Sequence, residues 1–265
     1  MIVLLKFDFN GKSTEDVLTT PLAVCEFDTQ QELPYITRSV LKGALCNHRR
    51  ANYYDTKEEE SLVITCSLVK TTGEGFTSSD RNIVESWLKG LNLPSKLSMY
   101  GNNGEVAYID GIFTSVSWTR VGRIVAGLTF TFECETNMYY LEKSVTKNIS
   151  GTTTFKLNVN TAEDKAFPTI TLNNLNNADS TATIRCNGSE LPIKLKAHEI
   201  IKINNEFLLI ETGQTYESVG FDKLNKINWI ELNNGENEIQ ISGGNFTLSI
   251  EYREYYYGLG SYFED

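Results

Sequence analysis

The chain has 265 residues and a mass of 29.9 kDa, enough for one large domain or two ordinary ones. Hydrophobic residues make up 40% of it and charged residues 22%, a balance typical of a globular chain rather than a disordered or fibrous one. The formal net charge is −10, and acidic residues outnumber basic ones in both halves, so we expect no direct nucleic-acid partner. No run of about 18 apolar residues occurs, so we expect no membrane span.

The N-terminal stretch MIVLLKFDFNGK has a short apolar run, no basic segment before it and no small-residue cleavage site. We therefore expect a strand and synthesis in the cytosol rather than a signal peptide. The cysteines are odd in number, widely spaced and without a C-x-x-C pair, which argues against a disulfide framework or a zinc site. We interpret them as small buried hydrophobes: Cys25, Cys46, Cys66, Cys134 and Cys186.

The N-terminal half contains one clear helical pattern. Apolar residues at positions 83, 84, 87, 88 and 91 form a single stripe, with Ser79 or Asp80 as the expected cap and Gly90 and Pro94 at the end. Trp87 and Leu88 lie on this stripe and are expected to anchor the helix in the core. Before it, we expect a short helical turn within Leu33–Leu45 and an exposed loop over Arg49–Glu60.

Alternation of apolar and polar residues predicts strands along most of the chain, so the protein is expected to be mainly β. Four Asn-Gly pairs, at residues 10, 103, 187 and 234, supply the two positive φ angles of a type I′ hairpin turn. The predicted strands include Ile109–Trp118, Ile124–Cys134, Phe155–Val159, Thr169–Leu172, Ile193–Leu195, Phe207–Ile210, Glu238–Ile241 and Phe246–Tyr252.

A domain boundary is expected where the composition of the sequence changes. The polar stretch Glu142–Thr154 is interpreted as a linker, and no helical pattern follows it. We therefore predict an α+β domain over residues 1–143 and a β-sandwich over residues 144–265.

No motif predicts catalysis. The chain has no GxSxG, Walker, HExxH or Rossmann fingerprint, no D-x-[DN]-x-[DN]-G calcium loop, and only two histidines, His48 and His198. We therefore expect no enzyme activity, no catalytic residue, no cofactor and no metal.

Several patterns, taken in order along the chain, are more specific. FDFNG (Phe7–Gly11) opens the chain, SWL lies on the helix after the strand SLVITCSLV, and the long strand GLTFTFECETNMYY follows. The C-terminal half contains FPTITLNNL and the motif W-I-x-L-x-x-G-x-N-x-I, from Trp229 to Ile239, and closes with a strand that carries Tyr252-Arg253. In this order the sequence resembles the distal tail (Dit) protein family of tailed bacteriophages and prophages.

Within the last motif, Trp229 and Leu232 are expected to face the core, Gly235 to take the turn, and Asn237 to bond its own backbone. The resemblance implies a tube-like belt domain with one helix, followed by a galectin-like or carbohydrate-module-like sandwich. It also implies a homo-hexameric ring between the tail tube protein and the tail-associated hub protein, at the tail tip of the virion, assembled in the bacterial cytoplasm. In some relatives the outer sandwich carries receptor-binding proteins.

The alternative function is a carbohydrate-binding module that contacts the bacterial cell surface. It is motivated by the tyrosines near the C-terminus, whose faces could stack on sugar rings: Tyr252, Tyr255, Tyr256, Tyr257 and Tyr262. The competing interpretation is that alternate tyrosines of a strand pack inward.

Overall fold

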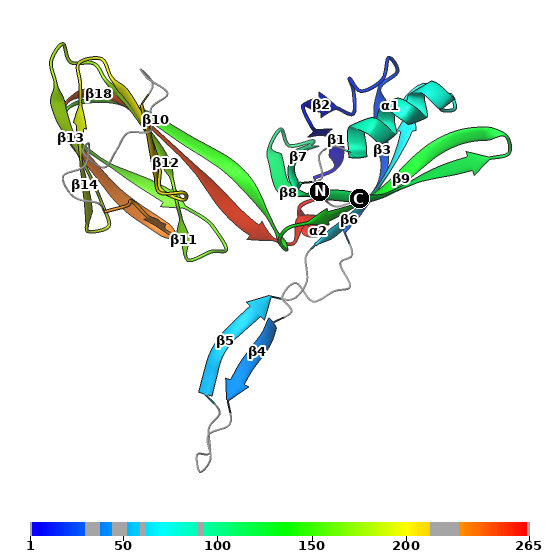
Figure 1. Cartoon of the computed structure of the whole chain (residues 1–265), viewed down its shortest axis with the longest axis horizontal. Coiled ribbons are helices and arrows are strands. Elements are labelled where there is room, and N and C mark those ends of the chain that lie inside the picture. The colour runs from blue at the N-terminus through cyan, green and yellow to red at the C-terminus, as the bar shows by residue number, and fades with distance from the viewer. Residues whose placement is uncertain are drawn as a thin grey trace. The chain divides into compact units, whose positions relative to one another are not determined.

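The computed structural model describes residues 2–29, 38–43, 52–58, 62–89, 93–212 and 228–263. The structure confirms a mainly β fold (Figure 1). It divides into two compact units, of which the first comprises Met1–Tyr140 with Tyr256–Asp265 and the second comprises Leu141–Tyr255. Whether residues 144–265 fold as a separate domain stays a prediction, and the structure groups the last ten residues with the first unit.

The first unit holds two helices and the earlier strands of the chain. Its elements are β1 (Leu4–Phe9), β2 (Lys12–Ser13), β3 (Leu22–Thr29), β4 (Arg38–Gly43), β5 (Asn52–Glu58), β6 (Val63–Lys70), α1 (Ser78–Lys89), β7 (Ser95–Gly101), β8 (Val106–Val121), β9 (Ile124–Cys134) and α2 (Leu259–Tyr262).

The second unit is built from strands. They are β10 (Met138–Val159), β11 (Lys165–Ala166), β12 (Thr169–Asn174), β13 (Ser180–Cys186), β14 (Ser189–Leu195), β15 (Ile200–Asn204), β16 (Leu209–Thr212), β17 (Leu232–Asn233) and β18 (Gly235–Tyr257). The first residues of β10 and the last of β18 belong to the first unit.

One long strand connects the two halves of the sheet in the first unit. The N-terminal part of β8 pairs with β7, which pairs with β1, and its C-terminal part pairs with β9, which pairs with β6 and β3. Gly111 is the residue at which both partners meet it, opposite Ser95 and Cys134. A Cβ at Gly111 would lie 2.3 Å from the Glu133 carbonyl oxygen, so only glycine fits this close approach.

Aromatic side chains fill the core between these two halves. Phe7 of β1 meets Phe130 of β9 edge to face at 5.3 Å, and Phe9 meets Phe132 at 6.1 Å. Phe113 of β8 touches all of them, with ring centroids 4.7–6.5 Å apart. Residues 7 and 9 share one face of a strand, as do 130 and 132, because side chains alternate along β-structure. The period-two alternation in the sequence therefore places the rings of β1 and of β9 on the faces that form this core.

The helix α1 begins with a reciprocal cap. The Asp80 amide donates to Thr77 Oγ1 at 3.2 Å, and the Thr77 amide donates to Asp80 Oδ2 at 2.8 Å. Asp80 also accepts from the Lys70 ammonium at 2.7 Å. The cap is thus Thr77, not Ser79 or Asp80 as the sequence suggested. Asp80 occupies the third helical position and completes the cap from there.

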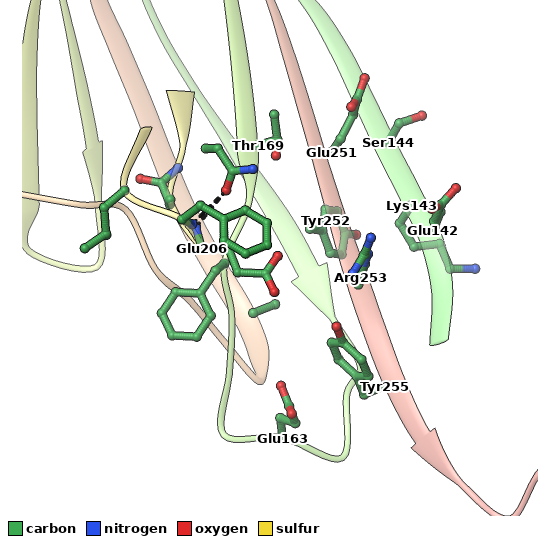
Figure 2. Close-up of a pocket in the computed structure, with 16 residues that line it drawn as sticks. Glu142, Lys143, Ser144, Glu163, Thr169, Glu206, Glu251, Tyr252, Arg253 and Tyr255 are labelled. Carbon is green, nitrogen blue, oxygen red and sulfur yellow. Dashed lines mark hydrogen bonds between the residues drawn. The ribbon is translucent and has the colours of Figure 1, made fainter. Parts of the chain in front are cut away.

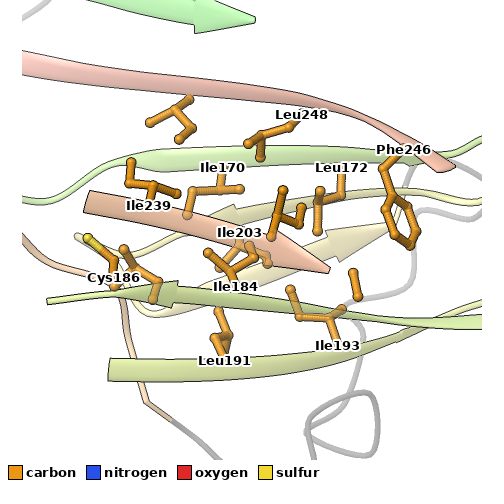
Figure 3. Close-up of a cluster of buried hydrophobic side chains, with 14 of the residues drawn as sticks. Ile170, Leu172, Ile184, Cys186, Leu191, Ile193, Ile203, Ile239, Phe246 and Leu248 are labelled. Carbon is orange, nitrogen blue, oxygen red and sulfur yellow. The ribbon is translucent and has the colours of Figure 1, made fainter. Parts of the chain in front are cut away.

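The second unit is a two-layer arrangement in which β18 contributes to both layers. Ile239–Ser242 pair with β13, whereas Phe246–Glu251 pair with β12, which continues to β15 and β16. The change of partner falls at Gly243-Gly244, where φ is +114° and +148°. Buried aliphatic residues from both layers form the core between them, as Figure 3 shows for Ile170, Ile184 and Leu248.

Several local predictions were wrong. Glu142–Thr154 is not a linker but part of the strand β10, and its polar residues are mostly exposed positions of that strand. The predicted helical turn within Leu33–Leu45 is contradicted by β4, which pairs with β5 inside the predicted loop at Arg49–Glu60. In both cases tertiary strand pairing overrides the local composition.

The turn predictions were correct in part. Asn10-Gly11 and Asn187-Gly188 have positive φ at both residues, as a type I′ turn requires. At Asn103-Gly104 and Asn234-Gly235 only the glycine has positive φ, so these turns are of another kind.

The thiols are mostly core residues. Cys66, Cys134 and Cys186 are buried, and this burial raises the pKa of each thiol. Cys25 is exposed, against expectation, and its thiol donates to the Ser67 carbonyl at 3.3 Å. Cys46 and His48 lie outside the described residues.

Candidate functional site

The residues singled out from the sequence fall into two groups, one in each unit. Trp87 and Leu88 lie in the first unit, whereas Trp229, Leu232, Gly235 and Asn237 lie close together in the second. Trp87, Leu88, Leu232 and Asn237 are buried, and the exposed surfaces described below lie elsewhere.

Trp87 fixes the helix α1 to the strand β1. Its side chain is 5% exposed, its ring stacks on Phe7 with centroids 5.5 Å apart, and its Nε1 donates to the Phe9 carbonyl at 2.7 Å. Leu88 beside it is also buried. The indole therefore satisfies its polar atom while contributing its area to the core.

Asn237 is a fully buried hydrogen-bonding centre. Its Nδ2 donates to the carbonyls of Asn233 and Gly235, at 2.8 and 3.0 Å, and reaches that of Leu157 at 3.4 Å. Its Oδ1 accepts from the Asn233 amide at 2.7 Å and from Asn187 Nδ2 at 2.6 Å. The side chain thus ties the β17–β18 turn to the β13–β14 turn and to β10.

Three further residues of the motif support the same region of the second unit. Leu232 is fully buried and pairs with Ala166, which joins β17 to β11. Trp229 is half-buried and packs against the aliphatic core, and Gly235 takes the turn with φ at +102°. The motif therefore positions the turn between β17 and β18.

The tip of the β8–β9 hairpin exposes two apolar side chains, beside Arg120 and Arg123, that the sequence analysis did not identify. Val121 is 67% exposed and Ile124 is 58% exposed, on either side of Gly122-Arg123. The signal in the sequence was the pattern V-G-R-I between two long strands. We call residues 121–124 the hairpin tip. Exposed apolar side chains at a hairpin end are available for contact with a partner.

A pocket of about 690 Å³ opens in the second unit beside the turn between β15 and β16. Figure 2 shows Glu206 on one side of it, with Tyr252 and Arg253 of β18 on the other. Phe207, Leu208 and Phe167 supply apolar lining. We call this space the β15–β16 pocket.

The prediction of a strand over Phe207–Ile210 was wrong at its start, because β16 begins at Leu209.

Two asparagines hold the turn that forms one wall of this pocket. Asn204 Oδ1 accepts from the amides of Glu206 and Phe207, both at 3.0 Å. Asn205 is 1% exposed; its Nδ2 donates to the Pro168 carbonyl at 2.6 Å, and its Oδ1 accepts from the Ile230 amide at 2.8 Å. The turn is therefore fixed to the body of the sandwich.

The C-terminal tyrosines are distributed over both units. Tyr252 is buried and Tyr255 half-buried in the second unit, and burial is the main cause that raises the pKa of each phenol. Tyr256 and Tyr262 lie in the first unit beside Tyr139, with centroids 5.5 and 5.0 Å from it. None of the five tyrosines considered for sugar stacking, Tyr257 included, is an exposed residue.

Within the described ranges, no group of His, Cys, Asp and Glu side chains has the arrangement of a metal site. No helix among the described residues has the length and apolar character needed to span a bilayer.

Comparison with known proteins identifies the family. Residues 3–136 match the family model described as phage tail protein N-terminal domain. This match covers half of the chain, so the chain belongs to that family of phage tail proteins. No curated protein matches the sequence.

One solved structure shares the fold over nearly the whole chain. The crystal structure of the Dit protein (gp 19.1) of phage SPP1 matches with a TM-score of 0.61 and 13% identity, over 96% of this chain and 99% of that one. A chain of the phage P2 baseplate, in its activated conformation with Ca, gives a TM-score of 0.49 and 12% identity, over 95% and 98%. The fold is therefore that of the SPP1 Dit protein, and family and fold together indicate a structural component of a phage tail rather than an enzyme.

Proposed function

We propose that the protein is the distal tail protein of a virion baseplate. In this proposal it forms a homo-hexameric ring at the tail tip, joins the tail tube protein to the tail-associated hub protein, and offers its second unit to receptor-binding proteins. It assembles in the cytoplasm of the bacterial host. The observation that carries the proposal is the shared fold along 96% of the chain with SPP1 Dit, whose structure is described as a paradigm of the hub adsorption apparatus.

The first unit supplies surfaces that suit a ring. Among the described residues, β3 pairs with β6 and with no other strand. Apart from Leu22, whose amide donates to the Thr14 carbonyl, its outer backbone groups can extend a sheet into a neighbouring subunit. The hairpin tip adds exposed apolar contact area through Val121 and Ile124. A ring needs two different surfaces per subunit, because its contacts run head to tail.

The second unit suits an outward position. Its aliphatic core lies wholly between Ile149 and Tyr252, so it does not depend on the strands that the first unit would use in the ring. A galectin-like role for this sandwich remains part of the proposal.

Light scattering coupled to size-exclusion chromatography tests the proposal on the full chain, alone and mixed with the tail tube and hub proteins of the same phage. We expect six copies in the assembled complex. We expect Val121→Asp to weaken assembly without changing the melting temperature, because the side chain is 67% exposed. The matched control is Leu175→Asp, at a 49% exposed position of the second unit. A chain that stays monomeric and binds neither protein under any assembly condition would overturn the proposal.

A further inference from the structure

The β15–β16 pocket has the size and chemistry of a ligand site, and the proposed ring does not use it. Its volume of about 690 Å³ lies in the range of about 300–1,000 Å³ typical of small-molecule sites. Its lining combines aromatic and aliphatic side chains with carboxylates, an amide, hydroxyls and a guanidinium.

The exposed rings are the first argument for the kind of ligand. Phe207 is 65% exposed and Phe167 is 41% exposed, and both line the pocket. An aromatic face carries partial negative charge and attracts the slightly positive C–H groups on the flat face of a pyranose ring. Two such rings beside hydrogen-bonding groups form the combination that a sugar needs, with one apolar face and a hydroxyl edge.

The second argument is that the wall is built in advance. Asn205 is buried and joins the turn to Pro168 and Ile230, while Asn204 fixes the amides of Glu206 and Phe207. Leu208, next to Phe207, has φ at +57°, a left-handed conformation that costs a branched residue energy. Such strain persists where surrounding structure enforces it, often at binding sites. Phe207 is thus presented to solvent by a rigid turn.

The third argument concerns charge. Four carboxylates line the pocket, from Glu142, Glu163, Glu206 and Glu251, against the cations of Lys143 and Arg253. Negative groups in excess repel phosphate-bearing or acidic glycans, and they accept hydrogen bonds from the hydroxyls of uncharged ones. Figure 2 shows these side chains around the same space, carried by β10, β18, the β15–β16 turn and, for Glu163, the loop between β10 and β11.

We propose that the β15–β16 pocket binds a neutral saccharide. Phe207 and Phe167 pack on the sugar ring, and Glu206, Glu251 and Arg253 bond its hydroxyls. This assignment replaces the tyrosine platform considered from the sequence, because Tyr256 is stacked on Tyr139 in the first unit. It does not rest on the proposed ring.

The test begins with the full chain on an array that carries neutral and anionic glycans side by side. The best neutral glycan is then titrated by calorimetry against the unaltered chain and against Phe207→Ala, Phe167→Ala and Leu209→Ala. We expect each phenylalanine variant to bind the glycan roughly tenfold more weakly, because it lacks one of the two rings that pack on the sugar. Leu209→Ala is the matched control, because Leu209 is 52% exposed nearby and does not line the pocket. Its affinity should not change.

Each outcome of these binding measurements either supports the proposed saccharide site or overturns it. Phe207 is mostly exposed, so its variant should keep the melting temperature and the assembly behaviour of the unaltered chain. The proposal is overturned if no neutral glycan binds, if only anionic glycans bind, or if Phe207→Ala binds the glycan as tightly as the unaltered chain does. It is equally overturned if Phe207→Ala abolishes binding of another tail protein while no glycan binds, because the pocket is then a protein-docking surface.

Discussion

At the scale of single residues, Asn237 shows how one buried amide can organise a turn. Its Oδ1 and Nδ2 bond four residues, of which Asn233 and Gly235 are near in sequence and Leu157 and Asn187 are distant. The sequence predicted a bond of Asn237 to its own backbone, and the local bonds of the structure run to the backbone of Asn233 and Gly235. It could not predict the bonds to Asn187 and Leu157, because strand pairing alone brings those residues close.

Replacing Asn237 with leucine should destabilise the second unit. The substitution keeps the approximate volume but leaves the buried partners of the amide unpaired, and each such group costs about 1–3 kcal/mol. We expect the free energy of unfolding to fall by about 3 kcal/mol, measured by urea denaturation. The control is Asn158→Ala at an exposed position of β10. Equal denaturation midpoints for the two variants would contradict the assigned role.

Asp80 makes one contribution to stability dependent on pH. The Lys70 ammonium and the Thr77 amide hold the pKa of this carboxyl down at about 2, below its ordinary value of 3.8. A folded-state pKa below the unfolded one stabilises the fold above about pH 4, and this stabilisation is lost as the pH falls toward 2.

Asp80→Asn should therefore lower the melting temperature at pH 7 and change its pH dependence. The variant leaves the Lys70 ammonium, 7% exposed, without its carboxylate, which lowers the stability at pH 7. It also removes the carboxyl that titrates, so its stability should decline less between pH 4 and pH 2 than that of the unaltered chain. Calorimetric melting at pH 7, 4 and 2.5 measures the effect. The exposed Asp16→Asn is the control. A profile for Asp80→Asn parallel to that of the unaltered chain would exclude this account.

At the scale of elements, periodicity in the sequence predicted the strands and the helix well. The bounds of β9 match the prediction, whereas α1 begins at Ser78, before both of the predicted caps, Ser79 and Asp80. Long-range pairing was not predictable from local pattern. Gly111 and Gly243-Gly244 allow β8 and β18 to pass between layers, yet a glycine in a strand does not reveal which backbone will approach it.

The β15–β16 pocket was missed for a related reason. Its walls come from β10, β12, β18 and the β15–β16 turn, which lie together only after the sheets have formed. The run Phe207–Ile210 is apolar enough to look like a buried strand, but Asn204 bends the chain before it and leaves Phe207 in solvent.

The attachment of α1 depends on Trp87, and graded substitutions should separate its two contributions. Trp87→Phe keeps a ring against Phe7 but removes the bond to the Phe9 carbonyl, which should cost about 1–2 kcal/mol. Trp87→Ala also removes the buried ring and should cost about 3–5 kcal/mol, enough to impair folding of the first unit. Thermal denaturation with measurement of soluble yield tests both. An unchanged melting temperature for Trp87→Ala would mean that the helix does not pack as described.

At the scale of the whole molecule, the chain combines two units with different tasks in the proposed assembly. The family match covers residues 3–136, within the first unit, and the fold match covers both. The aliphatic core of the second unit is drawn entirely from its own residues. This separation is what a ring with an outward-facing module requires.

A fragment comprising residues 141–255 should therefore fold alone as a monomer. About 115 residues with a continuous core are enough for an independent domain. A cooperative thermal transition by circular dichroism and a monomeric mass by light scattering are the expected results. An unfolded fragment, or one that itself forms the ring, would show that the division of tasks is mistaken.

Electron cryomicroscopy of the tail tip of the phage that encodes this chain tests the central claim most directly. The account predicts six copies of the chain in a closed ring between the last ring of the tail tube and the hub protein, with the first unit making the contacts between copies. Density for the chain elsewhere on the tail, or as separate copies that do not touch one another through the first unit, would contradict it.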